Sequence, residues 1–386
     1  MAQHELILGI DLGTSFSTAA AWVNGKMYLV PDERGEPCIP TVVHFGASGP
    51  PLVGHTALEA RRSDPENTVA GIKRLLGRDL ESPEGRVFAA GAPNKLKPAK
   101  NGRAIIHTRR GEHTAEEVAS SVYAHLKRLA EARFQRRVTK AVLTVPAASS
   151  AASIEATVRA AGQAGLEVLD TVHEPTAAAT AYGLDRFRGQ RRLLVYDFGG
   201  GTFDVTLMRQ HDQTLEPLEV GGDASLGGED FDMALAQYAA SVVWKHHQVE
   251  IHHDVVRWDR VLRASEATKR ALSAMAAARL RVQNAYSAKG RNQDIDLTVS
   301  REDMAPRWKD LVDRSLRCTA ETMVKAGLRP SGIDALILVG GTTYIPMVRD
   351  AVTRMMSTPG EHPGDPQTAV ACGAAVRAAR HALQAA

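Results

Sequence analysis

Two short segments of this chain, about 190 residues apart, combine an aspartate with a glycine-rich turn. GIDLGTSFS spans residues 9–17 and VYDFGGGTFDV spans residues 195–205. Each contains an apolar run typical of a strand, an aspartate, a turn with a threonine, and a second predicted strand. Glycine lets the backbone approach a phosphate closely and direct several N–H groups at its oxygens. Asp11 and Asp197, beside these turns, offer the oxygen ligands that Mg²⁺ prefers.

The duplication decides between two interpretations of these turns. A single copy would more often be an ordinary β-hairpin with glycine at positive φ, and threonine also stabilises turns that bind nothing. Two copies with matching aspartates predict two lobes that close on a nucleotide. The turn residues expected at its phosphates are Gly13, Thr14, Ser15, Gly199, Gly200, Gly201 and Thr202.

Three further charged residues have types that suit phosphoryl chemistry. Lys73, in AGIKRLLG, offers a compact ammonium for a point contact to a transferring phosphoryl group. Glu174, in HEPTAAA, lies between a predicted strand and a predicted helix, where a carboxylate can position water or a hydrated metal. An acid favoured by the helix dipole explains Glu174 almost as well. Asp204 follows Asp197 by seven residues and is predicted either to assist the cation or to form a salt bridge.

One predicted helix carries a set of polar residues on a single face. Glu266, Lys269, Arg270 and Ser273 follow the i, i+3, i+4, i+7 spacing, so they could clasp an adenosine. A solvated helix with surface salt bridges is the alternative. Glycine between a buried strand and a helix marks ligand sites in α/β folds. Loop residues expected near the same nucleotide are Gly227, Gly228, Glu229, Gly340, Gly341, Thr342 and Tyr344.

The elements that must position these residues alternate between strands and helices, which predicts an α/β fold. Thr114 and Glu117 have the spacing of a capping box at a helix start. Helices are predicted at residues 153–164, 176–182, 230–246, 257–277, 302–326 and 368–385, strands at 140–145, 168–172, 280–284, 295–299 and 335–339, and surface loops at 85–102 and 357–366.

Length and composition narrow the class of protein. The 386 residues exceed what one core usually organises, which predicts two lobes. With 47 basic against 44 acidic residues, the net charge of +3 indicates neither nucleic acid nor membrane as a partner. The distant cysteines Cys38, Cys318 and Cys372 favour a reducing cytoplasm. No signal peptide or apolar run of ~18 residues is visible, so we expect a cytoplasmic monomer.

Ordered motifs over nearly the whole chain resemble the ATPase domain of the seventy-kilodalton heat-shock chaperones, the DnaK-like family. They include GIDLGTSFS, DPENTVAGIKRLLGRDL, HEPTAAATAYGL, VYDFGGGTFDV, GGDASLGGEDFD, SEATKRALS and LILVGGTTYIPMV. The resemblance implies the actin-like ATPase fold, a duplicated ribonuclease H-like arrangement with two lobes around an ATP cleft. It implies lobe I at residues 1–188, with the C-terminal helix 367–386 packing back on it, and lobe II at 189–366.

The resemblance also implies roles for single residues. ATP or ADP with Mg²⁺ is the implied cofactor, and K⁺ is an additional candidate. Asp11, Asp197 and Glu174 would hold the metal, mostly through water. The implied hydrolytic and magnesium-organising group is Asp11, Thr14, Lys73, Glu174, Asp197 and Thr202. We add Asp204 to the predicted catalytic residues because of its place after Asp197. The implied adenosine contacts are Glu266, Lys269, Arg270, Ser273, Gly340, Gly341 and Thr342.

Three departures from the family pattern affect function. Family members typically continue into a hydrophobic linker and a peptide-binding domain, whereas this sequence ends at RAARHALQAA, so we expect that domain to be lacking. After Pro146 the family usually shows YFND and then an arginine; here residues 148–151 are ASSA, and Ile154 takes the arginine position. Tyr344 stands where an arginine usually covers the adenine, and its ring could stack there instead.

The leading hypothesis is a slow Mg-dependent ATPase whose lobe closure is recognised by an unidentified partner protein. A module that traps ATP without turnover, a small-molecule kinase of the same fold, and a filament-forming relative remain alternatives. The kinase would need a polar pocket between the lobes, and the sequence shows no diagnostic acceptor motif.

Overall fold

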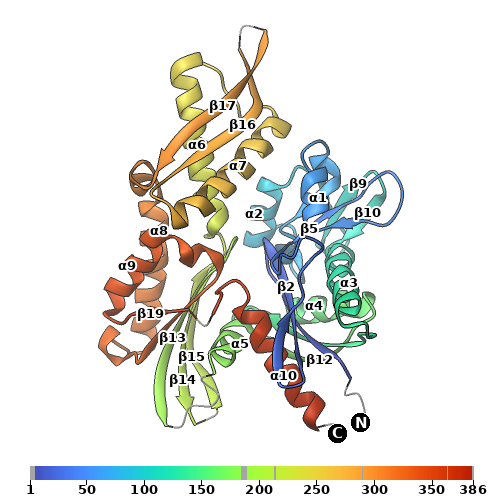
Figure 1. Cartoon of the computed structure of the whole chain (residues 1–386), viewed down its shortest axis with the longest axis vertical. Helices are drawn as coiled ribbons and strands as arrows, with labels where there is room; N and C mark the ends of the chain where they lie inside the picture. The colour runs from blue at the N-terminus through green and yellow to red at the C-terminus, as the bar shows by residue number, and fades with distance from the viewer. Residues whose placement is uncertain (1–4, 184–188, 213, 289, 363, 385–386) are drawn as a thin grey trace.

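The computed structural model describes residues 5–183, 189–212, 214–288, 290–362 and 364–384. We call the described residues up to Gly183, together with the last helix, lobe I, and those from Gly189 to residue 362 lobe II. The predicted boundary at residue 188 lies outside the described residues, as do the last two residues of the predicted C-terminal helix. Each lobe is built around a mixed sheet with helices on its faces (Figure 1).

The two central sheets have the same topology. In each, three consecutive antiparallel strands are followed by two parallel strands added beside the first, in the order third, second, first, fourth, fifth. Asp11 and Asp197 therefore lie near the ends of equivalent strands. The strands of lobe I are β1 (Ile7–Leu12), β2 (Phe16–Val23), β3 (Lys26–Leu29), β11 (Lys140–Val145) and β12 (Glu167–His173), and those of lobe II are β13 (Gln190–Phe198), β14 (Phe203–His211), β15 (Thr214–Asp223), β18 (Ala335–Val339) and β19 (Gly360–Glu361).

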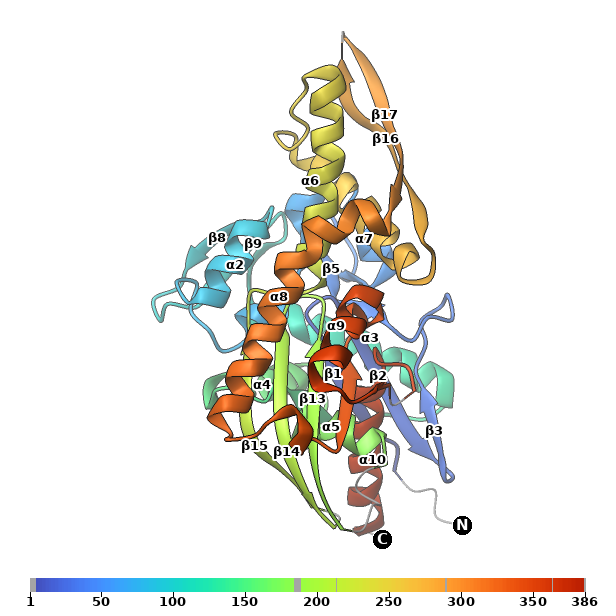
Figure 2. The ribbon, with the colours of Figure 1, turned by 90° about the vertical axis from the view of Figure 1, so that its left-hand side faces the viewer.

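Helices cover the sheets and build the outer parts of both lobes (Figures 1 and 2). The predicted capping box of Thr114 and Glu117 is present at the start of α3, and Ser300 with Asp303 forms another at α8. The helices are α1 (His55–Ala60), α2 (Pro83–Gly91), α3 (Ala115–Phe134), α4 (Ala151–Gln163), α5 (Glu174–Ala181), α6 (Gly228–His247), α7 (Val255–Ala274), α8 (Arg301–Lys325), α9 (Pro346–Met356) and α10 (Ala369–Gln384).

Smaller sheets complete the outer parts of the lobes. In lobe I, two three-stranded sheets lie near α1 and α2, and in lobe II a long hairpin packs on α7 (Figure 1). The short strand β4 (Ile39–Pro40) pairs with β2 and belongs to the central sheet of lobe I. The strands of the smaller sheets are β5 (Val42–His44), β6 (Leu52–Val53), β7 (Thr68–Ala70), β8 (Lys95–Pro98), β9 (Ala104–Thr108), β10 (Gly111–Thr114), β16 (Ala277–Ala288) and β17 (Arg291–Ser300).

The last helix, α10, lies against the first sheet. A Cβ at Gly9 on β1 would lie 2.1 Å from the backbone nitrogen of Ala375, so strand and helix backbones are in direct contact. Near the middle of α10, Arg377 Nε donates to Asp170 Oδ2 at 2.9 Å. Among the helices of the described residues, none has the length and apolar composition needed to cross a membrane.

Several predicted elements differ from the structure. The strands predicted at 280–284 and 295–299 are the inner parts of the longer strands β16 and β17. Residues 85–102 are not simply a loop, because Ser82 caps α2, Phe88 buries its side chain, and β8 pairs with β9. The helix predicted to reach residue 277 ends at Ala274, where the chain turns into β16. The predicted loop at 357–366 contains the short strand β19.

Candidate functional site

A cavity of about 720 Å³ lies between the lobes where the two glycine-rich turns meet. It receives residues from β1, β13, α5, α6 and α7. Of the predicted site residues, Asp204 lines an adjoining cavity, and Gly201 and Gly228 lie beside the wall. The predicted residues in the wall are Asp11, Gly13, Thr14, Ser15, Lys73, Glu174, Asp197, Gly199, Gly200, Thr202, Glu229, Glu266, Lys269, Arg270, Ser273, Gly340, Gly341, Thr342 and Tyr344.

Carboxyl groups from three elements converge at the inner end of this cavity. Asp197 and Asp204 face each other in register across the β13–β14 hairpin. Asp11, near the end of β1, accepts a hydrogen bond from Thr144 Oγ1 at 2.7 Å. Burial, reinforced by the charges of Glu174 and Asp204, raises the pKa of Asp197 well above its usual range. Without a cation this carboxyl therefore favours its protonated form, and a bound cation would stabilise the ionised form.

Lys73 is the basic group that lies among these carboxyls. It belongs to a single 3₁₀ turn, Ile72–Leu75, and its Nζ donates to Glu174 Oε1 at 2.6 Å. Burial alone would lower the pKa of Lys73, but the charges of Glu174 and Asp11 outweigh that effect and raise it. Burial raises the pKa of Glu174 to about 7 although Lys73 opposes the shift. Lys73 thus keeps its positive charge.

The two glycine-rich turns approach each other from opposite lobes. A Cβ at Gly200 would lie 2.1 Å from Ser15 Oγ, and one at Gly201 would lie 2.6 Å from Thr14 Cγ2. Glycine is the residue that leaves room for this approach. Facing backbone turns and clustered carboxyl oxygens form a donor set that suits a magnesium-bound triphosphate, so the residues present fit the predicted cofactor.

Three of the predicted ligand residues hold the second turn in place. The backbone N–H groups of Gly228 and Glu229 donate to the carbonyls of Gly199 and Gly200, at 3.0 and 2.8 Å. Thr342 Oγ1 also donates to the Gly199 carbonyl, at 2.8 Å. The start of α6 and the loop after β18 therefore fix the turn.

The predicted adenosine face of α7 lines the outer part of the cavity. Lys269 Nζ donates to the Gly228 carbonyl and to Asp232 Oδ2, both at 2.8 Å. The guanidinium of Arg270 lies 5.7 Å from the centre of the Phe16 ring. Sequence reasoning missed Asp232, whose buried Oδ1 has no hydrogen-bond partner among the described residues. Burial raises its pKa to about 7.

Tyr344 lines the cavity as the last residue of the 3₁₀ turn, Gly341–Tyr344, that follows β18. Its hydroxyl donates to Asp365 Oδ1 at 2.8 Å, and its ring meets the ring of His362 edge-on, 5.8 Å between centres. These two contacts fix the ring at the mouth of the cavity. Stacking on adenine stays a prediction.

A bridge between the lobes was also missed by the sequence analysis. Arg74 of lobe I donates to Glu229 Oε2 at 3.0 Å and to the Gly201 carbonyl at 2.9 Å, and Ser15 Oγ donates to Glu229 Oε1 at 2.9 Å. We call Ser15, Arg74 and Glu229 the interlobe bridge. No local signal separates Arg74 from a solvated arginine, because its partners lie 127 and 155 residues away.

Comparison with known protein families identifies the family to which this chain belongs. The sequence model of the family described as Hsp70 protein matches residues 7–384. This chain belongs to the Hsp70 family. The Hsp70 family is a chaperone family of ATP-binding ATPases with the actin-like fold. The predicted family and fold class are therefore confirmed, and the duplicated strand order is the structural form of that fold.

The raised pKa of Glu174 predicts how pH changes the stability of the nucleotide-free Hsp70-family chain. The unfolded carboxyl ionises near its ordinary 4.5, whereas the folded one keeps its proton to about 7. The contribution of the Glu174 carboxyl to the free energy of unfolding is therefore fully present below pH 4.5 and is lost as pH rises through 7. The loss amounts to at most about 3 kcal/mol. Urea unfolding between pH 4.5 and 7.5 should show wild type losing stability relative to Glu174→Gln. A pH-independent difference would contradict the assignment.

Proposed function

We propose that this chain binds ATP with Mg²⁺ in the cavity between the lobes and slowly hydrolyses it to ADP and phosphate. The observation that carries the proposal is the buried Lys73–Glu174 pair among the carboxyls of Asp11, Asp197 and Asp204, where two glycine-rich turns meet. The Hsp70 family is an ATPase family, which supports the same conclusion. K⁺ is proposed as an additional cation.

Each group at the inner end has a proposed task. The bound magnesium would neutralise charge on the terminal phosphates. Asp11 and Asp197 hold the hydrated cation, with Glu174 acting through water, and Lys73 stabilises negative charge on the transferring phosphoryl group. Glu174 with Asp197 or Asp204 orients the attacking water. Thr14, Thr202 and the backbone N–H groups of both turns hold the phosphates.

The outer end of the cavity is proposed to hold the nucleoside. Glu266 accepts from the ribose hydroxyls, the stems of Lys269 and Arg270 cover the base, and the ring of Tyr344 stacks on it. Ser273, Gly340 and Gly341 complete this part of the site. Their common position in one wall supports this role.

We propose that nucleotide binding and release move the lobes, and that a partner protein recognises the closed arrangement. The interlobe bridge supports this idea because its contacts exist only when the lobes lie together. The three free cysteines support a reducing, cytoplasmic location, and a monomer is the proposed state.

Removing the bridge should speed nucleotide release. Glu229 is about half exposed, so its ion pair is worth no more than about 1 kcal/mol, and Glu229→Ala should raise the ADP release rate about fivefold. Stopped-flow displacement of fluorescent ADP measures this rate. Glu59→Ala is the matched control, because it removes a similarly exposed ion pair, with Arg34, inside lobe I. Equal release rates in all three proteins would mean that the bridge does not hold the lobes closed.

One experiment tests the proposed reaction. The purified chain is loaded with ATP, and the retained nucleotide and released phosphate are measured over time with and without Mg²⁺. Phosphate release that needs Mg²⁺, with ADP retained, is expected. Retention of intact ATP after prolonged incubation would instead identify a non-hydrolysing ATP sensor, and absence of nucleotide binding would reject both.

A further inference from the structure

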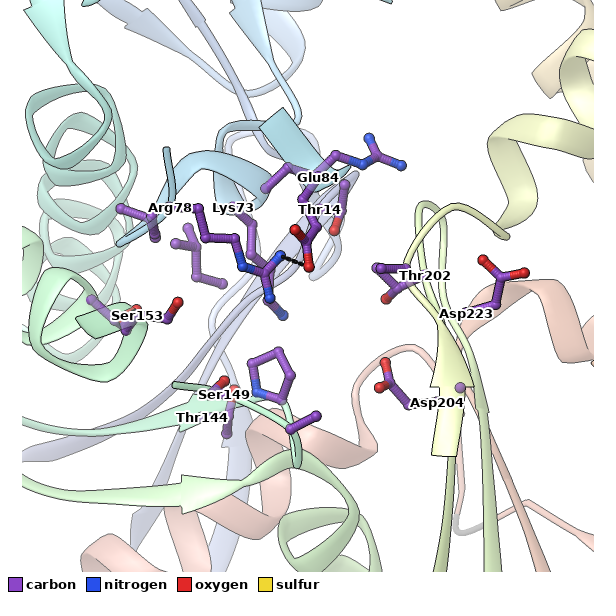
Figure 3. Close-up of a pocket in the computed structure, with 18 of the residues that line it drawn as sticks. Thr14, Lys73, Arg78, Glu84, Thr144, Ser149, Ser153, Thr202, Asp204 and Asp223 are labelled. Carbon is purple, nitrogen blue, oxygen red and sulfur yellow. Dashed lines mark hydrogen bonds and ion pairs between the residues drawn. The ribbon is translucent and has the colours of Figure 1, made fainter. Parts of the chain in front are cut away.

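A second cavity, of about 320 Å³, adjoins the phosphate end of the first and also lies between the lobes (Figure 3). Thr14, Lys73, Arg74 and Thr202 line both cavities. Its volume is at the lower end of the range of about 300–1,000 Å³ that is usual for small-molecule sites. A molecule bound in it would therefore lie next to the residues proposed to act on the terminal phosphate.

Small side chains form one wall of this second cavity. Ala148 and Ser149 belong to the run that departs from the family pattern, and Ser153 follows in α4. The backbone there is fixed, because Ser149 N–H donates to the Pro146 carbonyl at 3.1 Å and Ser150 caps α4. The space thus results from a short, ordered loop whose side chains are too small to fill it.

The walls carry balanced charge and several hydroxyl groups. Arg78 pairs with Glu84 at 3.2 Å, and Arg314 Nη2 donates to Asp223 Oδ2 at 2.6 Å (Figure 3 shows the first pair). Because the charges are compensated, a strongly charged ligand gains little here. The three basic and three acidic lining residues are Lys73, Arg74, Arg78, Glu84, Asp204 and Asp223.

The same walls suit a ligand with both hydroxyl and C–H surfaces. Thr144, Ser149 and Asp204 offer polar atoms at the lower side of the cavity (Figure 3). Pro146 and Val220 add apolar surface. Carboxyl, guanidinium and hydroxyl groups can donate to and accept from several ligand hydroxyls at once.

We propose that this second cavity binds a small neutral polyol beside the terminal-phosphate residues. The predicted effect on turnover rests on the proposed function, because a polyol hydroxyl next to Lys73 and Thr202 displaces the water needed for hydrolysis. Occupancy therefore lowers phosphate release. Binding of the polyol itself depends only on the cavity.

The binding test uses the full chain, with glycerol, erythritol and xylitol as probes in saturation-transfer NMR. Ala148→Tyr fills the cavity from an exposed position, so the fold should tolerate it. Ala151→Tyr is the matched control, because Ala151 is also exposed, three residues away, and outside the cavity wall. We expect probe signals in wild type and Ala151→Tyr, and at least about a fivefold loss in Ala148→Tyr. If Ala148→Tyr does not fold, Ser149→Phe replaces it.

The turnover test uses the same proteins. At ten times the probe's dissociation constant, phosphate release should fall about tenfold in wild type and Ala151→Tyr. In Ala148→Tyr, the probe should lower the rate of phosphate release less than twofold relative to the same variant without probe. Transfer of the terminal phosphoryl group from ATP to a probe hydroxyl would give a phosphate monoester and ADP, and the monoester is visible in the ³¹P spectrum. Its formation in wild type and Ala151→Tyr, but not in Ala148→Tyr, would also support binding of the probe beside the phosphate.

The outcomes separate this proposal from the proposed function. No probe signal in any protein, or equal signals in all three, overturns the polyol site even if calorimetry shows ATP binding. Cavity-dependent probe signals in a chain that binds no nucleotide would overturn the proposed ATPase and leave the polyol site standing.

Discussion

Replacing Lys73 with alanine is expected to lower the rate of phosphate release about a thousandfold, because it removes a preorganised positive charge from the transferring phosphoryl group. The ammonium is held by Glu174 at 2.6 Å and keeps its charge although it is buried. Combining the change with Asp197→Asn, which also weakens the proposed magnesium site, should leave no measurable turnover. Single-turnover phosphate release measures both variants.

Loss of the Lys73 ammonium should slow the hydrolytic step and leave the fold largely intact. Without Lys73, Glu174 can avoid a buried charge by keeping a proton. Circular dichroism and ATP calorimetry should therefore still report a folded, nucleotide-binding chain. Lys26→Ala is the control, since Lys26 is an exposed lysine of β3. Turnover that survives in the double variant would rule out this hydrolytic group.

Gly9→Ala is expected to destabilise the fold by about 3 kcal/mol, the upper part of the range for an overpacked core. The added Cβ would lie 2.1 Å from the Ala375 nitrogen and 2.7 Å from the Ala371 carbonyl oxygen, so α10 itself must move. Urea unfolding followed by circular dichroism measures the change.

Gly162→Ala is expected to have the opposite effect in the same urea unfolding experiment, namely to stabilise the fold. Gly162 is exposed near the end of α4, and apart from its chain neighbours and the backbone of its own helix no described atom lies within 4 Å of a Cβ built there. Alanine should raise stability by about 0.5–1 kcal/mol, because it favours the helix. If Gly9→Ala unfolds at the wild-type urea concentration, the contact between α10 and β1 is not made as described.

The sequence predicted those parts of the site that depend on local pattern. Asp11 and Asp197 could be placed because each follows an apolar strand and precedes a glycine-rich turn. The predicted face of α7 likewise depends on helical spacing, and Glu266 and Arg270 of that face line one cavity. The resemblance then supplied the arrangement of the lobes.

Contacts between distant segments could not be predicted in this way. The pairing of Asp232 with Lys269 joins residues 37 apart on different helices, and the interlobe bridge joins the two lobes. The second cavity needs residues 148–153 of lobe I opposite residues 220–224 of lobe II. The prediction for residues 85–102 was wrong for a different reason. Their glycine and proline content indicated a loop, whereas Ser82 caps the helix α2 that extends into this segment.

The hydrogen bonds between α6 and the second glycine-rich turn connect the site to a distant surface. Helix α6 has 20 residues, about 30 Å, and runs from the turn to the far tip of lobe II (Figure 2). At its start, the N–H groups of Gly228 and Glu229 donate hydrogen bonds to the carbonyls of Gly199 and Gly200. A displacement of α6 near His247 would therefore move the second glycine-rich turn with it, although the two ends of the helix lie about 30 Å apart.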